Sequence, residues 1–425
     1  MREVHPGRRH MPNLSFAGLP SARLTSRAGR IWAVAFVILL GAASAWAGEK
    51  VIFPLTSQYP YSYSGLASDA TGNLYGLVAG ATQESCYSIF ELSPVSGGTW
   101  TQTILYTFQS CIKEGLYPSG TLTLDSQGNI YGVQVSNLSD GSGRVYELKR
   151  GSNGTWTYGL VHSLNPDEGA PEGDLTWDKS GNLYRAAYYD STAFDGEVFE
   201  LSPQPGGSWK ETILYTFNYG DGANGPVGGV IFDSQGNLYG ATFFSSNANG
   251  GGAVYELSPQ TNGPWKLTVL YNFVNGSGAA FPDSRLTFDS SGNLYGTMNS
   301  TLDGGIFELS PSSGGTWTET TVHNFAGGDD GNTPVGNLVV DASRNVYGVT
   351  SAGGSGCNRN LCGVVYKFSQ SGGAWKETIV HPFESADDGS KPGAGLLLDS
   401  AGNLYGTTIH GGSRYGYGTI FEITP

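Results

Sequence analysis

Short apolar stretches recur along most of the chain, separated by glycine, proline and asparagine. One unit of the pattern contains the apolar segments 230–232 (VIF), 237–242 (NLYGAT), 253–257 (AVYEL) and 265–273 (WKLTVLYNF). They hold aromatic and β-branched residues with partial alternation of apolar and polar positions, which is typical of short β-strands. No stretch after residue 47 shows a sustained helical period with caps. The pattern therefore predicts an all-β fold.

A repeated octapeptide joins two of these predicted strands. It is DSQGNLYG at residues 233–240, and seven closely similar copies begin at Asp69, Asp125, Asp178, Asp233, Asp289, Asp341 and Asp399. Successive copies are 56, 53, 55, 56, 52 and 58 residues apart. A period of this size is typical of a solenoid, a propeller or an array. With four predicted strands in each unit, we expect a seven-bladed β-propeller.

The two ends of the chain predict how the ring closes. A tryptophan marks the fourth strand of six units: Trp100, Trp156, Trp209, Trp265, Trp317 and Trp375. The last unit stops at its third strand, Gly418–Pro425, and has no fourth. The segment Val51–Leu55, which precedes the first copy of the turn, aligns with the end of a unit at Leu214–Phe217. We expect this N-terminal strand to complete the last blade, which leaves no free sheet edge.

The repeated turn has a structural and a functional interpretation. In Asp-x-x-Gly-Asn the aspartate accepts hydrogen bonds from turn amides, and glycine or asparagine tolerates positive φ. Calcium is the alternative, but calcium loops supply several oxygen ligands and this turn offers one carboxylate. The same two interpretations apply to Asp-Gly loops before the first strand, at 167–169, 221–222, 329–331 and 387–389. We favour the turn in both cases and expect no cofactor, with Ca²⁺ as the alternative.

Residues 1–47 have the pattern of a signal peptide. Arg23, Arg27 and Arg30 precede the apolar run Ile31–Leu40, and Ala45-Trp46-Ala47 provides the small residues of a cleavage site. An uncleaved membrane anchor is the alternative, because the apolar run with its flank approaches the length of a spanning helix. We predict cleavage after Ala47 and a single repeat domain over residues 48–425.

The net charge of the chain after residue 47 limits the classes of partner that we expect. After residue 47 the chain has 16 basic and 35 acidic residues, a net charge of −19. An acidic surface of this strength argues against nucleic acid and anionic membranes as partners. We expect a monomer that is secreted, either extracellular or in the cell envelope, with no membrane association once the signal is cleaved.

Four cysteines follow the predicted cleavage site, where disulfides can form. Cys357 and Cys362 bracket the short loop CNRNLC, a spacing that does not fit a zinc or redox CxxC pair. Cys86 and Cys111 are expected on the same face of one blade. We predict one bridge in each pair, with two buried thiols as the alternative for Cys86 and Cys111.

A longer compound pattern surrounds the turn. It stands as DDGNTPVGNLVVDASRNVYGVTSAGG…GVVYKF at Asp329–Phe368 and as DDGSKPGAGLLLDSAGNLYGTTIHGGSRYGYGTIFEI at Asp387–Ile423. It resembles the GloVer tandem repeat of secreted bacterial proteins over essentially all of the chain after the signal. The resemblance implies export and a repeat architecture, and it carries no established activity to transfer. A looser likeness, through D-x-x-G-N-[LI]-Y alone, reaches the NHL and gluconolactonase-type propellers.

The seven units serve as controls for one another. Four residues before the turn aspartate they carry Gly65, Thr121, Asp174, Gly229, Arg285, Asn337 and Gly395. In the second strand a glycine present in six units is replaced once, by Arg185, and the loop of that unit adds Tyr188, Tyr189 and Asp190. Asp174, Arg185, Tyr188, Tyr189, Arg285 and Asn337 are therefore the predicted ligand-binding residues, and we expect them at the mouth of the central channel. Neutral drift with local salt bridges is the alternative, and we expect Asp174→Ala and Arg185→Ala to leave folding intact.

Catalytic motifs are scarce: the sequence has no HExxH, P-loop or GxSxG. His162, His323 and His381 fall at a fourth-strand position that holds tyrosine in other units, so we interpret them as substitutions on the blade surface. The sequence favours a non-catalytic protein that binds a polysaccharide or a surface protein through one face of variable loops. The alternatives are a glycan hydrolase or lyase or a metal-dependent lactonase that uses acids of the third unit, and a purely structural role.

Overall fold

The computed structural model describes residues 48–80, 85–109, 116–136, 143–164, 171–187, 196–218, 220–246, 250–276, 280–299, 303–354, 362–384, 387–412 and 416–425. All of them belong to one compact unit, Trp46–Pro425. The predicted signal peptide lies outside the described residues. Within those ranges, no helix has the length and apolar character needed to cross a bilayer.

The described residues are almost entirely β-strand, as the sequence predicts. The four-stranded sheets consist of β2 (Ala67–Ser68), β3 (Leu74–Ala79), β4 (Ser85–Val95) and β5 (Thr99–Gln109); of β6 (Leu116–Leu124), β7 (Ile130–Ser136), β8 (Gly143–Arg150) and β9 (Trp156–Leu164); of β18 (Thr287–Phe288), β19 (Leu294–Met298), β20 (Gly305–Pro311) and β21 (Trp317–Asn324); and of β22 (Asn332–Val340), β23 (Val346–Ala352), β24 (Val364–Ser371) and β25 (Ala374–Pro382). The short 3-10 helix η2 (Gly328–Asp330) precedes β22.

Two sheets are larger. One runs in the order β13 (Trp209–Thr216), β12 (Glu197–Pro203), β11 (Leu183–Ala187), β10 (Pro171–Trp177), β14 (Asn224–Phe232), β15 (Leu238–Phe244), β16 (Gly250–Ser258) and β17 (Lys266–Val274). The other runs in the order β1 (Gly48–Pro54), β29 (Thr419–Thr424), β28 (Leu404–His410) and β26 (Ser390–Pro392), with β27 (Leu397–Leu398) also paired to β28.

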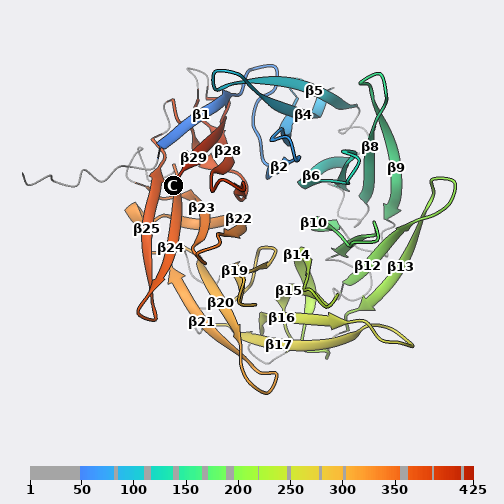
Figure 1. The fold of residues 1–425 in the computed structure, drawn as a ribbon. Helices are drawn as coiled ribbons and strands as arrows, with labels where there is room; N and C mark the ends of the chain where they lie inside the picture. The colour runs from blue at the N-terminus through green and yellow to red at the C-terminus, as the bar shows by residue number, and fades with distance from the viewer. Residues whose placement is uncertain are drawn as a thin grey trace, which may run out of the picture. The chain divides into compact units, whose positions relative to one another are not determined.

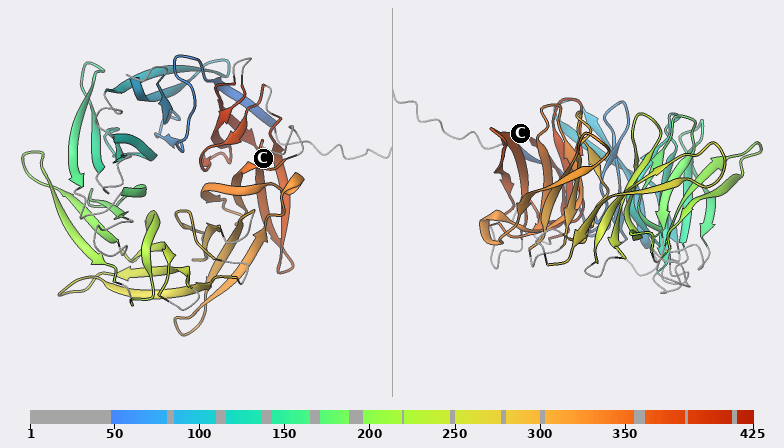
Figure 2. Two further views of the ribbon diagram at one scale, coloured as in Figure 1. Left: turned by 180° about the vertical axis from the view of Figure 1, so that it is seen from behind. Right: turned by 90° about the horizontal axis from the view of Figure 1, so that it is seen from below.

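The sheets follow one another around a central opening in a propeller-like arrangement (Figure 1). Within each four-stranded sheet the first strand lies nearest the centre and the fourth lies outermost (Figure 1). The strands run from one face of the ring to the other (Figure 2). β1 pairs antiparallel with β29, from Gly48 opposite Thr424 to Pro54 opposite Thr419. The predicted pairing of the N-terminal strand with the last strand of the chain is confirmed.

The core lies between neighbouring sheets. Close packing within it accounts for the glycine that recurs in the second strand. β7 is buried, and a Cβ added at Gly132 would lie 2.4 Å from the Tyr146 hydroxyl of the paired strand β8. Glycine at this position thus makes room for the large ring of the third strand. The same ring is Phe90, Tyr255, Phe307, Tyr366 or Phe421 beside the corresponding glycine of other sheets.

Candidate functional site

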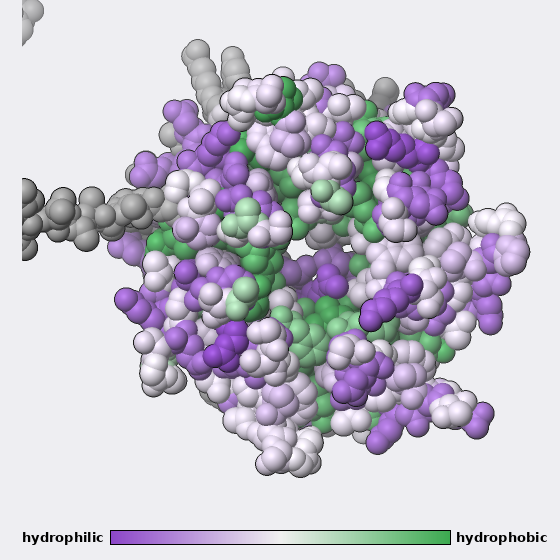
Figure 3. Space-filling model, in the orientation of Figure 1, coloured by the Kyte–Doolittle hydropathy of each residue, from purple (hydrophilic) through white to green (hydrophobic). Residues whose placement is uncertain are grey.

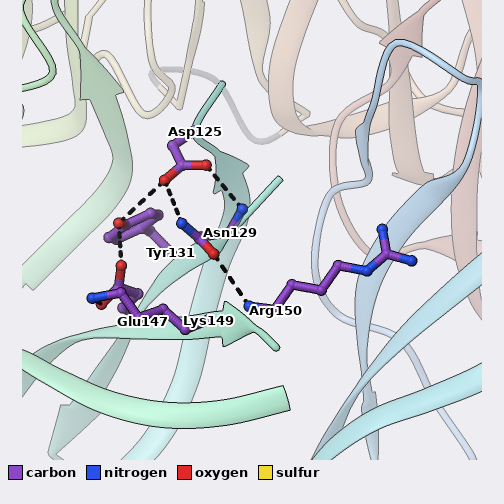
Figure 4. A network of polar contacts seen from close by, with 6 residues as sticks. All are labelled: Asp125, Asn129, Tyr131, Glu147, Lys149 and Arg150. Atoms are coloured by element: carbon purple, nitrogen blue, oxygen red, sulfur yellow. Dashed lines mark hydrogen bonds and ion pairs between the residues drawn. The ribbon is translucent and has the colours of Figure 1, made fainter. Parts of the chain in front are cut away.

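In each repeated turn the aspartate accepts hydrogen bonds from residues of its own turn, as Figure 4 shows for Asp125. The Oδ1 atom of Asp125 accepts hydrogen bonds from the backbone amides of Gln127 (2.8 Å) and Asn129 (2.9 Å), and Oδ2 accepts one from Asn129 Nδ2 (2.8 Å). The Tyr131 hydroxyl lies between the carboxylates of Asp125 and Glu147. The same set of turn bonds recurs at Asp69, Asp178, Asp233, Asp289, Asp341 and Asp399. Protein donors already bind both oxygens, which supports the structural interpretation.

Sequence reasoning missed the glutamate that completes this network. It comes from the third strand and approaches the turn tyrosine, as Glu200 does at 2.9 Å from the Tyr184 hydroxyl. Burial, this hydrogen bond and the two nearby carboxylates raise the pKa of Tyr184 well above its ordinary value. The glutamate that recurs in the [FY]-E-L motif of the third strand is the sequence signal that could have identified this partner. In one unit Lys367 takes its place, with its ammonium 5.4 Å from the ring of Tyr347.

A cavity of about 860 Å³ occupies the centre of the described unit. Figure 3 shows this hollow, with polar and apolar residues side by side on its walls. Among the described residues that line it are Asp174, Arg285 and Asn337, so the structure brings together three of the predicted ligand-binding residues. They come from, or directly precede, the innermost strands of different units, because each stands at the same place before its turn.

These three polar residues are bonded across the ring. Asn337 Nδ2 donates to Asp174 Oδ2 at 2.7 Å, and the other oxygen of Asp174 accepts from the Thr121 amide at 2.8 Å. Arg285 Nη2 donates to the Thr176 hydroxyl at 3.1 Å. Burial lowers the pKa of Arg285, and the charge of Asp174 opposes that shift. Asp174 and Asn337 lie within β10 and β22, so this polar group crosses the ring at mid-strand and not at the mouth of the channel.

The other predicted ligand residues are placed differently. Arg185 is fully buried in β11 and is not among the residues that line the cavity. Its burial contradicts the prediction that it lies at the channel mouth, because β11 is buried along its whole length between the paired strands β10 and β12. Tyr188 and Tyr189 lie outside the described residues, and so do Asp190 and Glu168.

Each predicted disulfide includes one cysteine that the structure describes. Cys362 is buried and Cys86 is half-buried. Their predicted partners, Cys357 and Cys111, lie outside the described residues, so both bridges stay predictions.

An aromatic group that sequence reasoning missed borders the cavity. The Tyr61 ring lies 6.4 Å from that of Tyr63, 5.8 Å from that of His410 and 6.3 Å from that of Tyr417. Tyr63 lines the cavity and is 52% exposed. Burial of part of the ring and the neighbouring Tyr61 raise the pKa of Tyr63. We call Tyr61, Tyr63, His410 and Tyr417 the aromatic rim; it lies by the loops before the first strand and after the second strand.

The backbone of the aromatic rim follows the repeat. Tyr61 has φ 54°, and Phe281, Thr333 and Lys391, which stand at the same place before their turns, have φ 56°, 55° and 57°. In each case the strained residue donates its amide to a carbonyl of the preceding unit, as Tyr61 does to Tyr417 at 2.9 Å. The positive φ is therefore explained by a bond between units, and the tyrosine side chain is what distinguishes this site. The two tyrosines at positions 61 and 63 of one unit are the sequence signal that could have identified the aromatic rim.

The histidines of the outer strands are not isolated surface substitutions. His323 Nε2 lies 3.0 Å from Asp330 Oδ1 and 3.7 Å from Glu377 Oε2, and His381 Nε2 lies 3.2 Å from Asp388 Oδ2. The aspartates belong to the Asp-Gly loops before the first strand. Burial and the hydrogen bond and charge of Asp330 raise the pKa of Glu377 to about 8. Burial raises the pKa of Asp330, but hydrogen bonds from Glu377 and Ala326 outweigh it and lower that pKa.

Comparisons with known proteins support the repeat and the fold. Residues 300–425 match the family model of the Gloeobacter/Verrucomicrobia repeat, which confirms the predicted resemblance over that segment. The sequence matches no curated protein.

Similar solved structures include polysaccharide lyases. A PL25 ulvan lyase is 12% identical, with 88% of this chain and 94% of the lyase covered and a TM-score of 0.53. Polysaccharide lyase Uly1 is 10% identical, with 89% and 98% covered and a TM-score of 0.53. A protein from Lactobacillus plantarum is 14% identical, with 80% and 88% covered and a TM-score of 0.51. At these identities the likeness shows the fold alone, an all-β propeller-like architecture.

Proposed function

We propose that this protein is a secreted, non-catalytic β-propeller that binds a polysaccharide at the aromatic rim and the central cavity. The observation that carries the proposal is the position of Tyr63, which lines the cavity and also continues the row of rings formed by Tyr61, His410 and Tyr417. An exposed aromatic surface thus leads directly to fixed polar groups at the centre of the ring.

We propose seven blades of four strands for the architecture that carries this site. The eight-stranded sheet is joined at its middle by a single parallel pair, Asp174 with Gly229. Every other pairing within it is antiparallel, so it divides into β10–β13 and β14–β17. With this division each copy of the Asp turn belongs to one four-stranded blade, and β1 supplies the fourth strand of the last.

The chemistry of a sugar suits this arrangement. The C–H faces of a pyranose stack on tyrosine rings, whereas its hydroxyls need hydrogen-bond partners in fixed positions. Asp174, Asn337 and Arg285 supply acceptors and donors that their bonds across the ring hold in place. Arg285 also provides a positive charge, which would favour a uronate-containing chain in an otherwise acidic protein. One PL25 ulvan lyase structure has a glycan of glucuronate and sulfated rhamnose bound, so a related fold accommodates such chains.

A glycan hydrolase or lyase is the second candidate, favoured by Tyr63 and Arg285 lining the same cavity. Hydrolysis by two carboxylates needs a pair, and Asp174 is the one carboxylate among the described residues that line the cavity. Both of its oxygens accept protein hydrogen bonds. The raised pKa of Tyr63 keeps its hydroxyl protonated at neutral pH, so little of the phenolate that could act as a base is present. These features favour binding over catalysis.

The test is a binding assay with purified protein and a panel of neutral and uronate-containing insoluble polysaccharides. Tyr63→Ala should lower affinity about fivefold for the polysaccharide that binds, since an aromatic stacking contact of this kind contributes about 1 kcal/mol. Leu160→Ala, which removes an exposed side chain from the outer strand β9, is the matched control and should bind like the unchanged protein. Equal affinity of the Tyr63→Ala and unchanged proteins would overturn the proposed site. New reducing or unsaturated ends in the same assay would show that the protein cleaves the polysaccharide, and would overturn the non-catalytic proposal.

A further inference from the structure

We propose that His323, Asp330 and Glu377 form a site for a divalent transition cation of the Zn²⁺ type, at the junction of two neighbouring sheets near the outer strands. The proposal is independent of polysaccharide binding. His323 belongs to β21, Asp330 ends η2, and Glu377 belongs to β25. One potential ligand atom from each residue lies within 4.8 Å of the other two.

The separations suit a small ion. Ligand atoms about 2.1 Å from a tetrahedral ion lie roughly 3.4 Å from one another. His323 Nε2 is 3.0 Å from Asp330 Oδ1 and 3.7 Å from Glu377 Oε2. Small shifts of these side chains would therefore complete three corners of a tetrahedron, and a water would take the fourth. One imidazole nitrogen with two carboxylate oxygens favours a transition cation over Ca²⁺ or Mg²⁺, which prefer oxygen alone.

The surroundings fix the three side chains. The His323 ring packs between Phe325, at 4.9 Å, and Phe368, at 5.0 Å between ring centroids. The Ala326 amide donates to Asp330 Oδ2 at 2.6 Å, and Oδ1 and Oδ2 lie 3.0 Å and 3.1 Å from His323 Nε2. Glu377 Oε1 is buried without a hydrogen-bond partner among the described residues. The three side chains are 24%, 23% and 18% exposed, so an ion can reach them from solvent.

The repeat itself links the histidine to the glutamate. The residue of the next outer strand that faces His162 is Glu211, at 3.5 Å, and His323 faces Glu377. Glu49 of β1 interacts electrostatically with His381. Where the histidine position holds Tyr106, the facing residue is Tyr158, whose ring stacks on it at 5.5 Å. A glutamate thus faces each of the three histidines, as expected when both contribute to one site.

The test is a Zn²⁺ titration of the full chain, with any affinity tag removed and with excess Ca²⁺ and Mg²⁺ present to occupy oxygen-only sites. Calorimetry gives the number of ions bound, and Co²⁺ substitution gives visible absorption bands that report nitrogen and oxygen ligation. His323→Tyr and Glu377→Gln should each remove one equivalent of bound Zn²⁺ or lower its affinity by about a hundredfold or more, since even residues that only hydrogen-bond to a metal ligand contribute 10- to 100-fold. The same ion should raise the Tm of the unchanged protein, because its ligands come from two sheets.

Two features of the chain keep this test decisive. Tyrosine occupies the equivalent position at Tyr215, where its hydroxyl donates to Asp221 at 2.8 Å, so His323→Tyr is expected to fold. Glu319→Gln is the matched control, since Glu319 occupies the place of Glu377 but faces Tyr271 in place of a histidine. It should bind Zn²⁺ like the unchanged protein. The proposal is overturned if the unchanged protein binds no Zn²⁺ under these conditions, or if His323→Tyr and Glu377→Gln bind it with unchanged number and affinity.

Discussion

The turn aspartates and Asp174 are all buried or half-buried carboxylates with both oxygens bonded, yet they bond over different distances along the chain. Asp289 accepts hydrogen bonds from residues two and four positions ahead of it. Asp174 accepts from Thr121, 53 residues away, and from Asn337, 163 residues away. The local network appears once in each unit, whereas the network across the ring appears once among the described residues.

This difference separates two roles that composition alone does not distinguish. A bond that closes within one turn can form in any unit, so it repeats with the sequence and shapes each sheet. A bond across the ring needs particular residues in several units, so it breaks the repeat. The departure from the repeat identifies residues that meet at the centre, but it does not make them dispensable for stability.

Removing a turn carboxylate should have the largest effect. Asp289→Ala is expected to cost about 3 kcal/mol of unfolding free energy, because it leaves two backbone amides and the Asn293 side chain without their acceptor. Urea denaturation followed by tryptophan fluorescence measures the change. Asp329→Ala is the control, since Asp329 is exposed, and it should change stability by less than about 0.5 kcal/mol. A loss at Asp289 as small as that of the control would show that the repeated turn does not stabilise the fold.

Asp174→Ala should have the next largest effect, about 2 kcal/mol. The sequence alone suggested no loss, but Asp174 is buried and bonded to Thr121 and Asn337, and its charge stabilises the half-buried Arg285. The double variant Asp174→Ala/Arg285→Ala should lose less than the sum of the two single losses, since the second change removes the uncompensated charge. Thermal unfolding of the three variants measures this coupling. Strict additivity would mean that the two residues do not stabilise each other.

The features that sequence predicts well are those contained within one unit or repeated in all. Three features follow from aligning the units: the turn network at Asp125, the pairing of β1 with β29, and the position of Asp174, Arg285 and Asn337 around the cavity. Arg185 was misplaced because its burial depends on how sheets pack, which a pattern along one strand does not reveal. The pairing of His323 with Glu377 was missed for a related reason. The two residues belong to different units, and no pattern along a single strand links them.

The smallest expected effect is the loss of stability in acid through the turn carboxylates. Burial raises the pKa of Asp341, but hydrogen bonds from Asn345 and from the Tyr347 hydroxyl and Ser343 amide outweigh it and lower that pKa. A carboxyl with a lowered pKa in the folded state stabilises the protein at pH above its unfolded pKa of about 4, and this contribution disappears as pH falls through the folded value. Asp341→Asn keeps one acceptor oxygen but does not titrate, so its Tm should fall less steeply than that of the unchanged protein between about pH 5 and pH 2. Tm measured against pH for both proteins decides the point. Parallel curves would show that the carboxylate of Asp341 has the same proton affinity in the folded and unfolded chains, and that the turn stabilises the fold through its shape and not through its charge.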